Sequence, residues 1–249
     1  TATAALRASG RSTGVVLDIG PEFSRAVPVV DGFARSHSAV REQLGANHAG
    51  WQLMAMLEKR GLKAMTVDYD TLRGVQEQSM FVSRDVQAEI KRAAASAADE
   101  KSRAIELTLS DNQRMSIDHE RFLCPEVLFD PLLLQPAKDR IAAASPKQSL
   151  PQLVWRAVRS MDAALTQTLL SNVVVTGGGS LFPGLPERLE QELKALVPAR
   201  FSVRVVAPPE RNVAAWVGAA QLASDPAIYI DKQEYDEEGP MQAKQRCVF

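Results

Sequence analysis

The sequence has little cysteine, almost no net charge and no long apolar run. Cys124 and Cys247 are the two cysteines among 249 residues, and neither has a histidine or a second cysteine nearby at ligand spacing. This pattern argues against a disulfide framework and against a zinc site, and it favours a reducing compartment. Apolar runs such as residues 127–129 and 132–134 are far too short to cross a bilayer.

The charges are balanced and interspersed. The chain has 29 basic and 30 acidic residues, which gives a formal net charge of −1. We therefore expect no direct binding to nucleic acid and no binding to an anionic membrane. With 45% hydrophobic residues the chain can bury a large core, and its length suits one large domain or two smaller ones.

Hydrophobic periodicity and turn residues predict an alternation of strands and helices. Gly61 is a candidate C-cap, and Pro186 suits the first turn of a helix. This order of elements predicts an α/β protein with two lobes. The expected elements are hairpins at 15–30 and 104–117, helices at 47–60, 71–98, 153–170 and 185–196, and a loop at 131–151.

Residues 173–184, Val-Val-Val-Thr-Gly-Gly-Gly-Ser-Leu-Phe-Pro-Gly, are the most informative segment. They predict a buried strand, a turn at Gly177, Gly178 and Gly179, and then a helix. Adjacent glycines let the backbone approach a flat or anionic ligand, and the helix presents N–H groups in its first turn. The same arrangement can simply connect a strand to a helix. Both interpretations stay open from these residues alone.

Further phrases occur along the chain in the order in which actins have them, and together they resemble the actin family. The phrases are Ser9-Gly10-Arg11, Val27-Pro28, Arg121-Phe122-Leu123-Cys124-Pro125-Glu126, the triple glycine, Ala207-Pro208-Pro209-Glu210-Arg211 and Cys247-Val248-Phe249. The resemblance covers essentially the whole chain and corresponds to the C-terminal two-thirds of an actin. It implies a divergent actin or actin-related protein whose N-terminal part is missing here.

The resemblance implies the actin-like, ribonuclease-H-related fold, in which ATP lies in a cleft between two halves. Residues 1–44 and 137–213 would form the lobe at the nucleotide cleft, similar to actin subdomain 3. Residues 45–136 would form the outer lobe, similar to subdomain 4. Residues 214–249 would be a helical segment that returns to the first lobe.

One phosphate-binding hairpin of the family has its counterpart at residues 18–22. Asp18 and Gly20 match the family pattern, in which the aspartate organises the water shell of a divalent metal. Pro21 and Glu22 depart from it. Proline lacks an N–H and glutamate adds a negative charge, so both changes work against phosphate. The segment is then either a weakened phosphate site, with Asp18 as an indirect metal contact through water, or an ordinary turn.

The nucleoside side is better preserved. Gly177, Gly178 and Gly179 match the family's glycine turn, and Glu77 stands where the family places a glutamate against the ribose hydroxyls. Departures from the pattern are Gln76 and Asn212 in place of lysines, and Ala46 in place of a glycine. The resemblance therefore implies ATP or ADP with magnesium as the cofactor, weakly bound or lost.

No catalytic residue is assigned. Hydrolysis of a γ-phosphate needs a metal, a closed phosphate cradle and a residue that orients water. By resemblance, Thr1 stands at the position of the water-orienting glutamine and Arg25 at that of a histidine. The three histidines have no partner spacing typical of a triad or metal site. We do not expect this chain alone to be an ATPase.

The partners implied by the resemblance are proteins, either actin-like subunits or a multi-subunit complex. Residues 129–134 resemble the start of the hydrophobic loop through which actin subunits meet, although this segment could equally pack on its own lobe. Arg7 replaces an aromatic residue at the cleft for actin regulators. We expect a structural protein of the cytoplasm and cytoskeleton, or of the nucleus. The alternative is an ATP-dependent enzyme of the wider superfamily, such as a sugar kinase or a chaperone ATPase.

Overall fold

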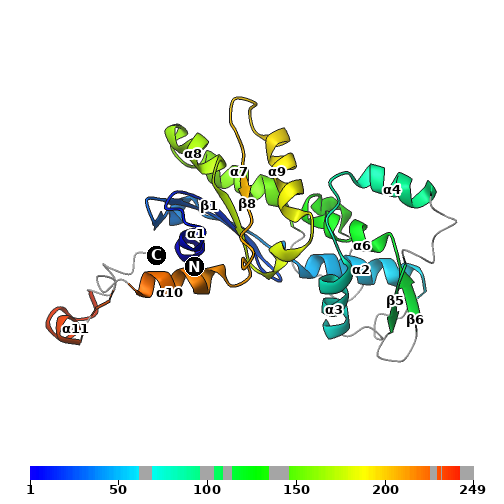
Figure 1. Ribbon diagram of the computed structural model, residues 1–249, viewed down its shortest axis with the longest axis horizontal. Coiled ribbons are helices and arrows are strands. Elements are labelled where there is room, and N and C mark those ends of the chain that lie inside the picture. The colour runs from blue at the N-terminus through cyan, green and yellow to red at the C-terminus, as the bar shows by residue number, and fades with distance from the viewer. Residues whose placement is uncertain are drawn as a thin grey trace.

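The computed structural model describes residues 1–61, 69–95, 104–108, 114–134, 146–224, 229–230 and 232–241, and the structural statements below concern these residues. The molecule is elongated (Figure 1). A mixed sheet with flanking helices forms one part. A smaller part with a two-stranded hairpin lies at one end, and the last helix lies at the other.

The main sheet has the order β3-β2-β1-β7-β8, and β4 pairs with β2. Strand β1 is antiparallel to β2 and parallel to β7, which is parallel to β8. Every residue of β7 is buried, as expected for an inner parallel strand. The strands are β1 (Gly14–Ile19), β2 (Ser24–Val30), β3 (Phe33–Ala34), β4 (Val40–Glu42), β7 (Val173–Thr176) and β8 (Val205–Val206).

Helices cover both faces of this sheet. Val15 and Leu17 pack with α7 and α9 in the larger core cluster, whereas Val16 packs in a second cluster with residues of α1 and α10. The alternating side chains of β1 thus join two helical layers to one sheet. The helices are α1 (Ala2–Ala8), α2 (Asn47–Lys59), α3 (Tyr69–Ser79), α4 (Val86–Ala95), α6 (Glu120–Leu123), α7 (Leu150–Arg159), α8 (Thr166–Leu170), α9 (Leu185–Leu196), α10 (Ala214–Ala223) and α11 (Lys232–Glu238).

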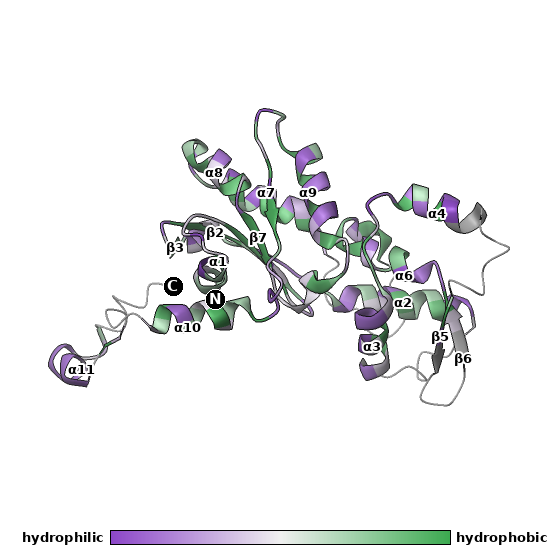
Figure 2. Cartoon of the chain, in the orientation of Figure 1, coloured by the Kyte–Doolittle hydropathy of each residue, from purple (hydrophilic) through white to green (hydrophobic). Residues whose placement is uncertain are grey.

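The smaller part contains α2, α3, α4 and the hairpin of β5 (Ile105–Thr108) and β6 (Arg114–Ile117). In Figure 2 purple and green residues alternate along α2, α3 and α4, whereas α10 is mostly green. Trp216 on α10 has 74% of its surface exposed. Short 3-10 helices connect the larger elements: η1 (Ser36–Ser38), η4 (Pro125–Leu128), η5 (Pro131–Leu133), η6 (Ala163–Leu165) and η7 (Gly178–Leu181).

The predicted α/β class, both hairpins and two of the helices are confirmed. Helix α2 ends at Lys59, and Gly61 follows with a φ of 96°, the left-handed conformation that a glycine C-cap adopts. Helix α9 has a proline in its first turn, as Pro186 predicts.

The single helix predicted over residues 71–98 is wrong within the described residues. Helix α3 ends at Ser79 and α4 begins at Val86, with an irregular segment at 80–85 between them. Val82 is buried there, and its N–H donates to the carbonyl of Pro183 at 2.8 Å. Asp85 accepts the N–H of Ala88 at 2.9 Å and so starts the second helix. Residues 96–98 of the prediction lie outside the described residues.

The predicted helix over 153–170 is also interrupted. Helix α7 ends at Arg159, and the carboxylate of Asp162 accepts the N–H of Ala164 at 3.0 Å to begin η6 and then α8. The apolar period continues across the break because both helices pack on the same core. Helix α7 also starts at Leu150, so the predicted loop at 131–151 is shorter, and its residues 135–145 lie outside the described residues.

Helices α1 and α10 pack so closely that Gly218 is required at their contact. A Cβ atom on Gly218 would collide with the backbone carbonyl of Ala4. We predict that Gly218→Ala lowers the free energy of unfolding by about 1–3 kcal/mol, the usual cost of overpacking. Urea unfolding measures the change.

Gly74 gives the matched control, because it lies inside α3 and a Cβ there would have nothing within 4 Å. Gly74→Ala should stabilise the chain by roughly 0.5–1 kcal/mol, since alanine loses less backbone entropy on folding. Equal stabilities of the two variants would contradict the close packing of α1 on α10.

Candidate functional site

The predicted site residues of the sheet gather where parallel strands end. Strands β1 and β7 run parallel, with Asp18 opposite Thr176 in the register. Gly20 follows β1, and the glycine turn, residues 177–179, follows β7. The carboxyl edge of parallel strands is where open α/β sheets bind ligands. The neighbouring β2 is antiparallel to β1, so this edge also marks a change of strand direction.

The three glycines of the glycine turn have different roles. Gly177 has a φ of 89°, and a Cβ on it would lie 2.6 Å from Oδ1 of Asp18. A Cβ on Gly179 would lie 2.6 Å from Cγ2 of Ile19. A Cβ on Gly178 would have nothing within 4 Å, and this residue is exposed. Packing on β1 thus explains Gly177 and Gly179, whereas Gly178 faces open space.

The glycine turn leaves two backbone donors available. Among the described residues, the N–H groups of Gly178 and Gly179 have no hydrogen-bond partner. The carbonyl of Gly177 is occupied, because it accepts the backbone N–H and the hydroxyl of Ser180 at 3.0 and 2.6 Å. Two adjacent N–H groups of this kind can bind an anionic or carbonyl oxygen.

Arg211 holds the glycine turn in place. Its carbonyl accepts the N–H of Gly177 at 3.0 Å and the hydroxyl of Thr176 at 2.7 Å. Its Nε donates to the carbonyl of Ser180 at 3.1 Å. In the sequence, Arg211 stands out only as part of a family phrase. Its contacts with the glycine turn join residues more than thirty positions apart in the chain, so no local pattern could reveal them.

Asp18 is the acidic group of the site. Burial raises the pKa of its carboxyl, and Arg25, directly opposite on β2, partly offsets that rise. Burying a carboxylate with incomplete compensation costs stability, which is typical of residues at functional sites.

The turn after β1, residues 20–22, is poorly suited to hold phosphate. The N–H of Gly20 donates to the carbonyl of Phe23 at 2.9 Å, and Pro21 has no N–H. The carbonyls of Gly20 and Pro21 accept the N–H groups of Ala46 and Asn47 at 3.0 and 2.8 Å. The carbonyl groups of this turn therefore bind the start of α2, and few of its backbone N–H groups are left to bind an anion.

Gln76 connects α3 to the start of α2. Its Nε2 donates to the carbonyl of Ala46 at 2.7 Å, and Gln76 is buried. Ala46 also lies beside the glycine turn, because a Cβ on Gly179 would be 3.2 Å from the Cβ of Ala46. The glycine turn, the start of α2 and Gln76 thus form one continuous set of contacts.

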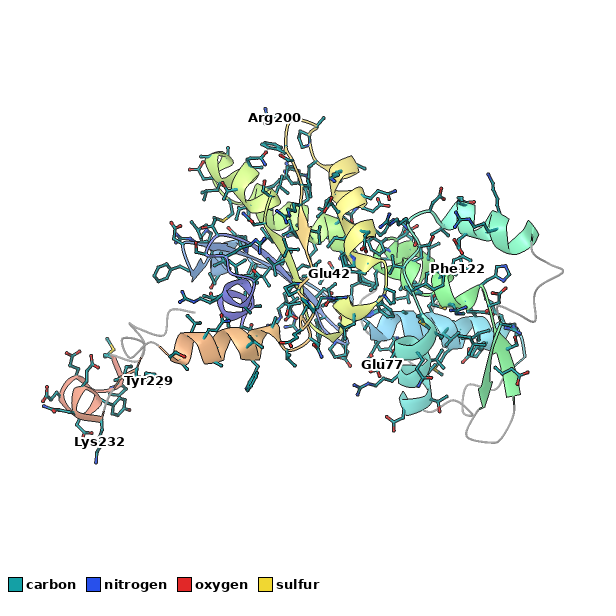
Figure 3. All side chains as sticks on the ribbon, viewed as in Figure 1. Glu42, Glu77, Phe122, Arg200, Tyr229 and Lys232 are labelled. Atoms are coloured by element: carbon teal, nitrogen blue, oxygen red, sulfur yellow. The ribbon has the colours of Figure 1, made fainter. Side chains whose placement is uncertain are left out.

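Glu77 is not brought into this set of contacts. Its side chain is 63% exposed on α3 and forms an ion pair with Arg73 at 2.8 Å (Figure 3). The structure thus brings together Asp18, Gly20 and the glycine turn, but no described contact joins Glu77 to them. Its assignment to the ribose stays a prediction.

At the end of β1, Asp18 is the carboxylate that could contact a metal ion. No group of three histidine, cysteine, aspartate or glutamate residues that could hold a metal occurs in the described parts of the chain. Magnesium is commonly bound through one or two carboxylates together with water and substrate phosphates. Asp18 therefore fits an indirect contact through water and does not form a metal site by itself.

The described histidines do not form a catalytic arrangement. His48 is buried at the start of α2, its Nδ1 lies 3.1 Å from the N–H of Gly45, and its ring packs on Trp51. Burial lowers the pKa of His48. His119 lies 3.3 Å from the carboxylate of Asp118 in the outer part. His37 is exposed on η1.

A groove of about 710 Å³ adjoins the glycine turn on the side of α9 and β8. It shares Arg211 and Gly184 with the neighbourhood of the turn, and Arg84 contributes to its wall. Two of its charged residues, Lys194 and Glu190, pair with each other at 2.5 Å. The groove has no local signal in the sequence, because its walls come from three separate segments.

The segment 129–134 packs on the core at its start and is exposed further on, and its role as a contact between subunits stays a prediction. Phe129 packs against the main core, whereas Leu132 is 92% exposed. The carboxylate of Asp130 accepts the N–H of Leu132 at 3.1 Å and so shapes η5. An apolar side chain is thereby held at the surface on a defined turn.

The whole chain, rather than the glycine turn alone, matches a known family. The family model described as Actin matches residues 1–248. In the described residues, no helix has both the length and the apolar character needed to cross a bilayer.

The buried carboxyl of Asp18 leads to a prediction about stability and pH. Because burial raises its folded pKa above the unfolded value, its cost to stability is absent below the unfolded pKa, near pH 4, and is fully present above the folded pKa. Asp18→Asn should raise the melting temperature at neutral pH by on the order of 2 °C.

The two melting curves should converge as the pH falls toward the ordinary pKa of aspartate. Thermal melting of both chains across this range measures the difference. Asp31→Asn, at an exposed turn where the side chain accepts the hydroxyl of Thr13 at 3.2 Å, is the control for removing a carboxylate and should change the melting temperature less than Asp18→Asn at neutral pH. A lower melting temperature of Asp18→Asn at neutral pH would show that Asp18 stabilises the fold.

Proposed function

The chain belongs to the actin family, and from that premise we propose that it is a divergent actin-related protein with a structural role. It acts as a subunit of a cytoskeletal filament or as a scaffold in a multi-subunit complex of the cytoplasm or nucleus. It binds ATP or ADP with magnesium weakly, and this chain alone does not hydrolyse ATP.

The observation that carries this proposal is the turn at residues 20–22. A phosphate cradle needs several backbone N–H groups directed at the anion. Here the N–H of Gly20 is used by Phe23, Pro21 has none, and Glu22 adds an exposed negative charge. Binding energy for the phosphates is therefore small.

The glycine turn supports residual binding of the nucleoside. The N–H groups of Gly178 and Gly179 are available, and Gly178 has open space above it. Gln76 has its side chain bonded to the carbonyl of Ala46, so it does not replace the cation that the family places there. Adenosine and ATP should consequently bind with similar affinities.

We do not propose hydrolysis, because the described residues do not bring together the groups that it requires. An in-line transfer needs a metal, a cradle for the leaving phosphate and a group that orients water. Asp18 fits an indirect metal contact, but the turn at residues 20–22 offers few donors. No arrangement among the described residues favours the alternative, an ATP-dependent enzyme such as a sugar kinase.

We propose the lobe boundaries that the resemblance implies. Residues 1–44 and 137–213 form the lobe with the main sheet, and residues 45–136 form the outer lobe with α2, α3, α4 and the small hairpin. Residues 214–249 are the C-terminal segment, whose helix α10 packs on α1. The exposed Leu132 in the outer lobe supports a contact with another actin-like subunit.

We predict that the chain binds an ATP analogue with a Kd weaker than about 1 μM, and that ATP binds less than about tenfold more tightly than adenosine. The double variant Pro21→Asp with Glu22→Gly should tighten ATP binding and leave adenosine binding unchanged. It restores an N–H at position 21 and removes the Glu22 side chain, while the negative charge moves to position 21 and the net charge stays the same, so the gain comes from the backbone donor. Fluorescence titration with magnesium, and competition by adenosine, measure both affinities.

Pro198→Asp makes one of these changes in an exposed turn after α9 and serves as the control, which should behave as the wild type. Unchanged ATP affinity in the double variant would show that residues 20–22 do not face phosphate. A submicromolar Kd for the wild type would contradict weak binding.

We predict that Leu132→Ser weakens assembly, either with itself or with an actin-like partner, by roughly tenfold or more if Leu132 is a central contact. Stability should change by less than about 0.5 kcal/mol, because the side chain is exposed in the free chain. Sedimentation over a range of concentrations measures assembly.

Leu196→Ser is the matched control, since Leu196 is 40% exposed at the end of α9. It should leave assembly unchanged. Equal assembly of the wild type and Leu132→Ser would exclude the segment 129–134 as the contact. A chain that stays monomeric with and without actin-like partners would contradict the structural role.

A further inference from the structure

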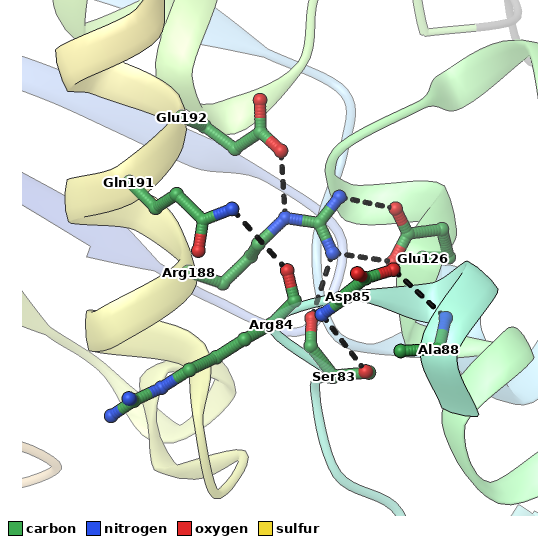
Figure 4. Close-up of polar contacts among 8 residues, drawn as sticks. All are labelled: Ser83, Arg84, Asp85, Ala88, Glu126, Arg188, Gln191 and Glu192. Atoms are coloured by element: carbon green, nitrogen blue, oxygen red, sulfur yellow. Dashed lines mark hydrogen bonds and ion pairs between the residues drawn. The ribbon is translucent and has the colours of Figure 1, made fainter. Parts of the chain in front are cut away.

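Arg188 is a nearly buried cation with four polar contacts (Figure 4). Its side chain is 11% exposed. Nη2 donates to Oε1 of Glu126 at 2.7 Å, and Nη1 lies 3.3 Å from Oε2 of the same carboxylate. Nε donates to Glu192 at 2.7 Å, and Nη1 donates to the carbonyl of Ser83 at 2.7 Å. The planar guanidinium can bind several acceptors at once in this way.

The charges around Arg188 depend on each other. Burial raises the pKa of Glu126, whereas the neighbouring guanidinium of Arg188 works against that rise, and Glu192 and Asp130 add negative charge. The guanidinium also lies 5.1 Å from the ring centre of Phe129. Removing Arg188 would leave the Glu126 carboxylate buried without its partner, which is a large penalty.

The partners of Arg188 belong to different parts of the molecule. Arg188 and Glu192 lie on α9, which follows the glycine turn directly, whereas Glu126 lies on η4 and Ser83 in the segment 80–85. These two partners fall within the proposed outer lobe. The ion pair therefore crosses the proposed boundary between the lobes, and it is buried where it does so.

The segment 80–85 links this ion pair to the nucleoside side of the site. It continues from α3, which carries Gln76. The N–H of Val82 donates to Pro183 at 2.8 Å, and a Cβ on Gly184 would collide with the carbonyl of Val82. Residues 183–184 stand between the glycine turn and α9, so the segment is held against both.

We propose that Arg188 is a positioning residue that holds α3 at a fixed distance from the glycine turn. It acts through Ser83 and Glu126 and touches no ligand itself. This inference rests on the proposed nucleotide site, whose two sides are α3 with the start of α2, and the glycine turn. The site keeps its width as long as Arg188 holds the segment 80–85 on α9.

The test compares the full chain with Arg188→Gln and Arg188→Lys. Two readouts are measured under conditions where every variant is folded: hydrogen exchange of the Val82 amide, and affinity for adenosine and a fluorescent ATP analogue. Arg188→Gln should speed Val82 exchange by roughly 100-fold and weaken nucleoside binding by about tenfold. Arg188→Lys keeps the charge but not the fork of donors, so its effect should be intermediate.

Arg60→Gln is the matched control. Arg60 pairs with the nearly buried Glu120 at 2.7 Å and joins α2 to α6 within the outer lobe. It should lower stability without changing Val82 exchange or nucleoside affinity. If Arg188 has only a structural role, Arg188→Gln should behave like Arg60→Gln: the melting temperature falls, but Val82 exchange and nucleoside affinity do not change. This result would overturn the proposal.

The outcomes separate this inference from the proposed function. Unchanged Val82 exchange in Arg188→Gln would overturn the positioning role, whatever the affinity. A wild-type chain that binds neither adenosine nor the analogue at millimolar concentration would contradict the nucleotide site, and with it the purpose assigned to Arg188. Faster exchange together with weaker binding in Arg188→Gln alone would support both.

Discussion

The turn after β7 packs directly on the end of β1, and this close approach constrains the surrounding structure. Gly177 and Gly179 are required because β1 leaves no room for a side chain at either position. Arg211, in the segment between β8 and α10, then binds this turn through its backbone and its side chain. Helix α9 must begin at a set place after the turn, which in turn places Arg188 against the segment 80–85. The candidate site, helix α9 and the ion pair between Arg188 and Glu126 thus all depend on this close approach.

The same edge of the sheet combines a retained acid with a weakened anion site. Asp18 keeps a buried carboxyl although burial raises its pKa. Three residues further on, Pro21 has no N–H to donate to a phosphate, and the carbonyls of Gly20 and Pro21 accept N–H groups at the start of α2. This edge therefore presents one buried carboxyl and a turn with few N–H groups for an anion. These two features are the basis of the function proposed above.

Much of the fold could be predicted from local patterns, and the failures have a common cause. Helix α2 with Gly61, and α9 with Pro186, carry their start or stop signals in the sequence. The helix predictions failed at residues 80–85 and 160–162, where the apolar spacing continues because the residues on both sides face the same core. At each break an aspartate, Asp85 or Asp162, accepts a backbone N–H and so begins the next helix. These caps involve residues only two or three positions apart, but a prediction from hydrophobic periodicity alone does not take them into account.

The sequence by itself determined the α/β class, the actin-family resemblance, the presence of Asp18 and the glycine turn, and the missing donor at Pro21. Proline lacks an N–H in any fold, and three adjacent glycines permit close backbone approach wherever they lie. Only the tertiary structure decided that Gly177 and Gly179 pack on β1 while Gly178 faces open space. It also decided that Gln76 binds Ala46 and that Arg188 binds Glu126. These contacts join residues from 30 to 62 positions apart. Their geometry depends on strand register and helix placement, which no local spacing specifies.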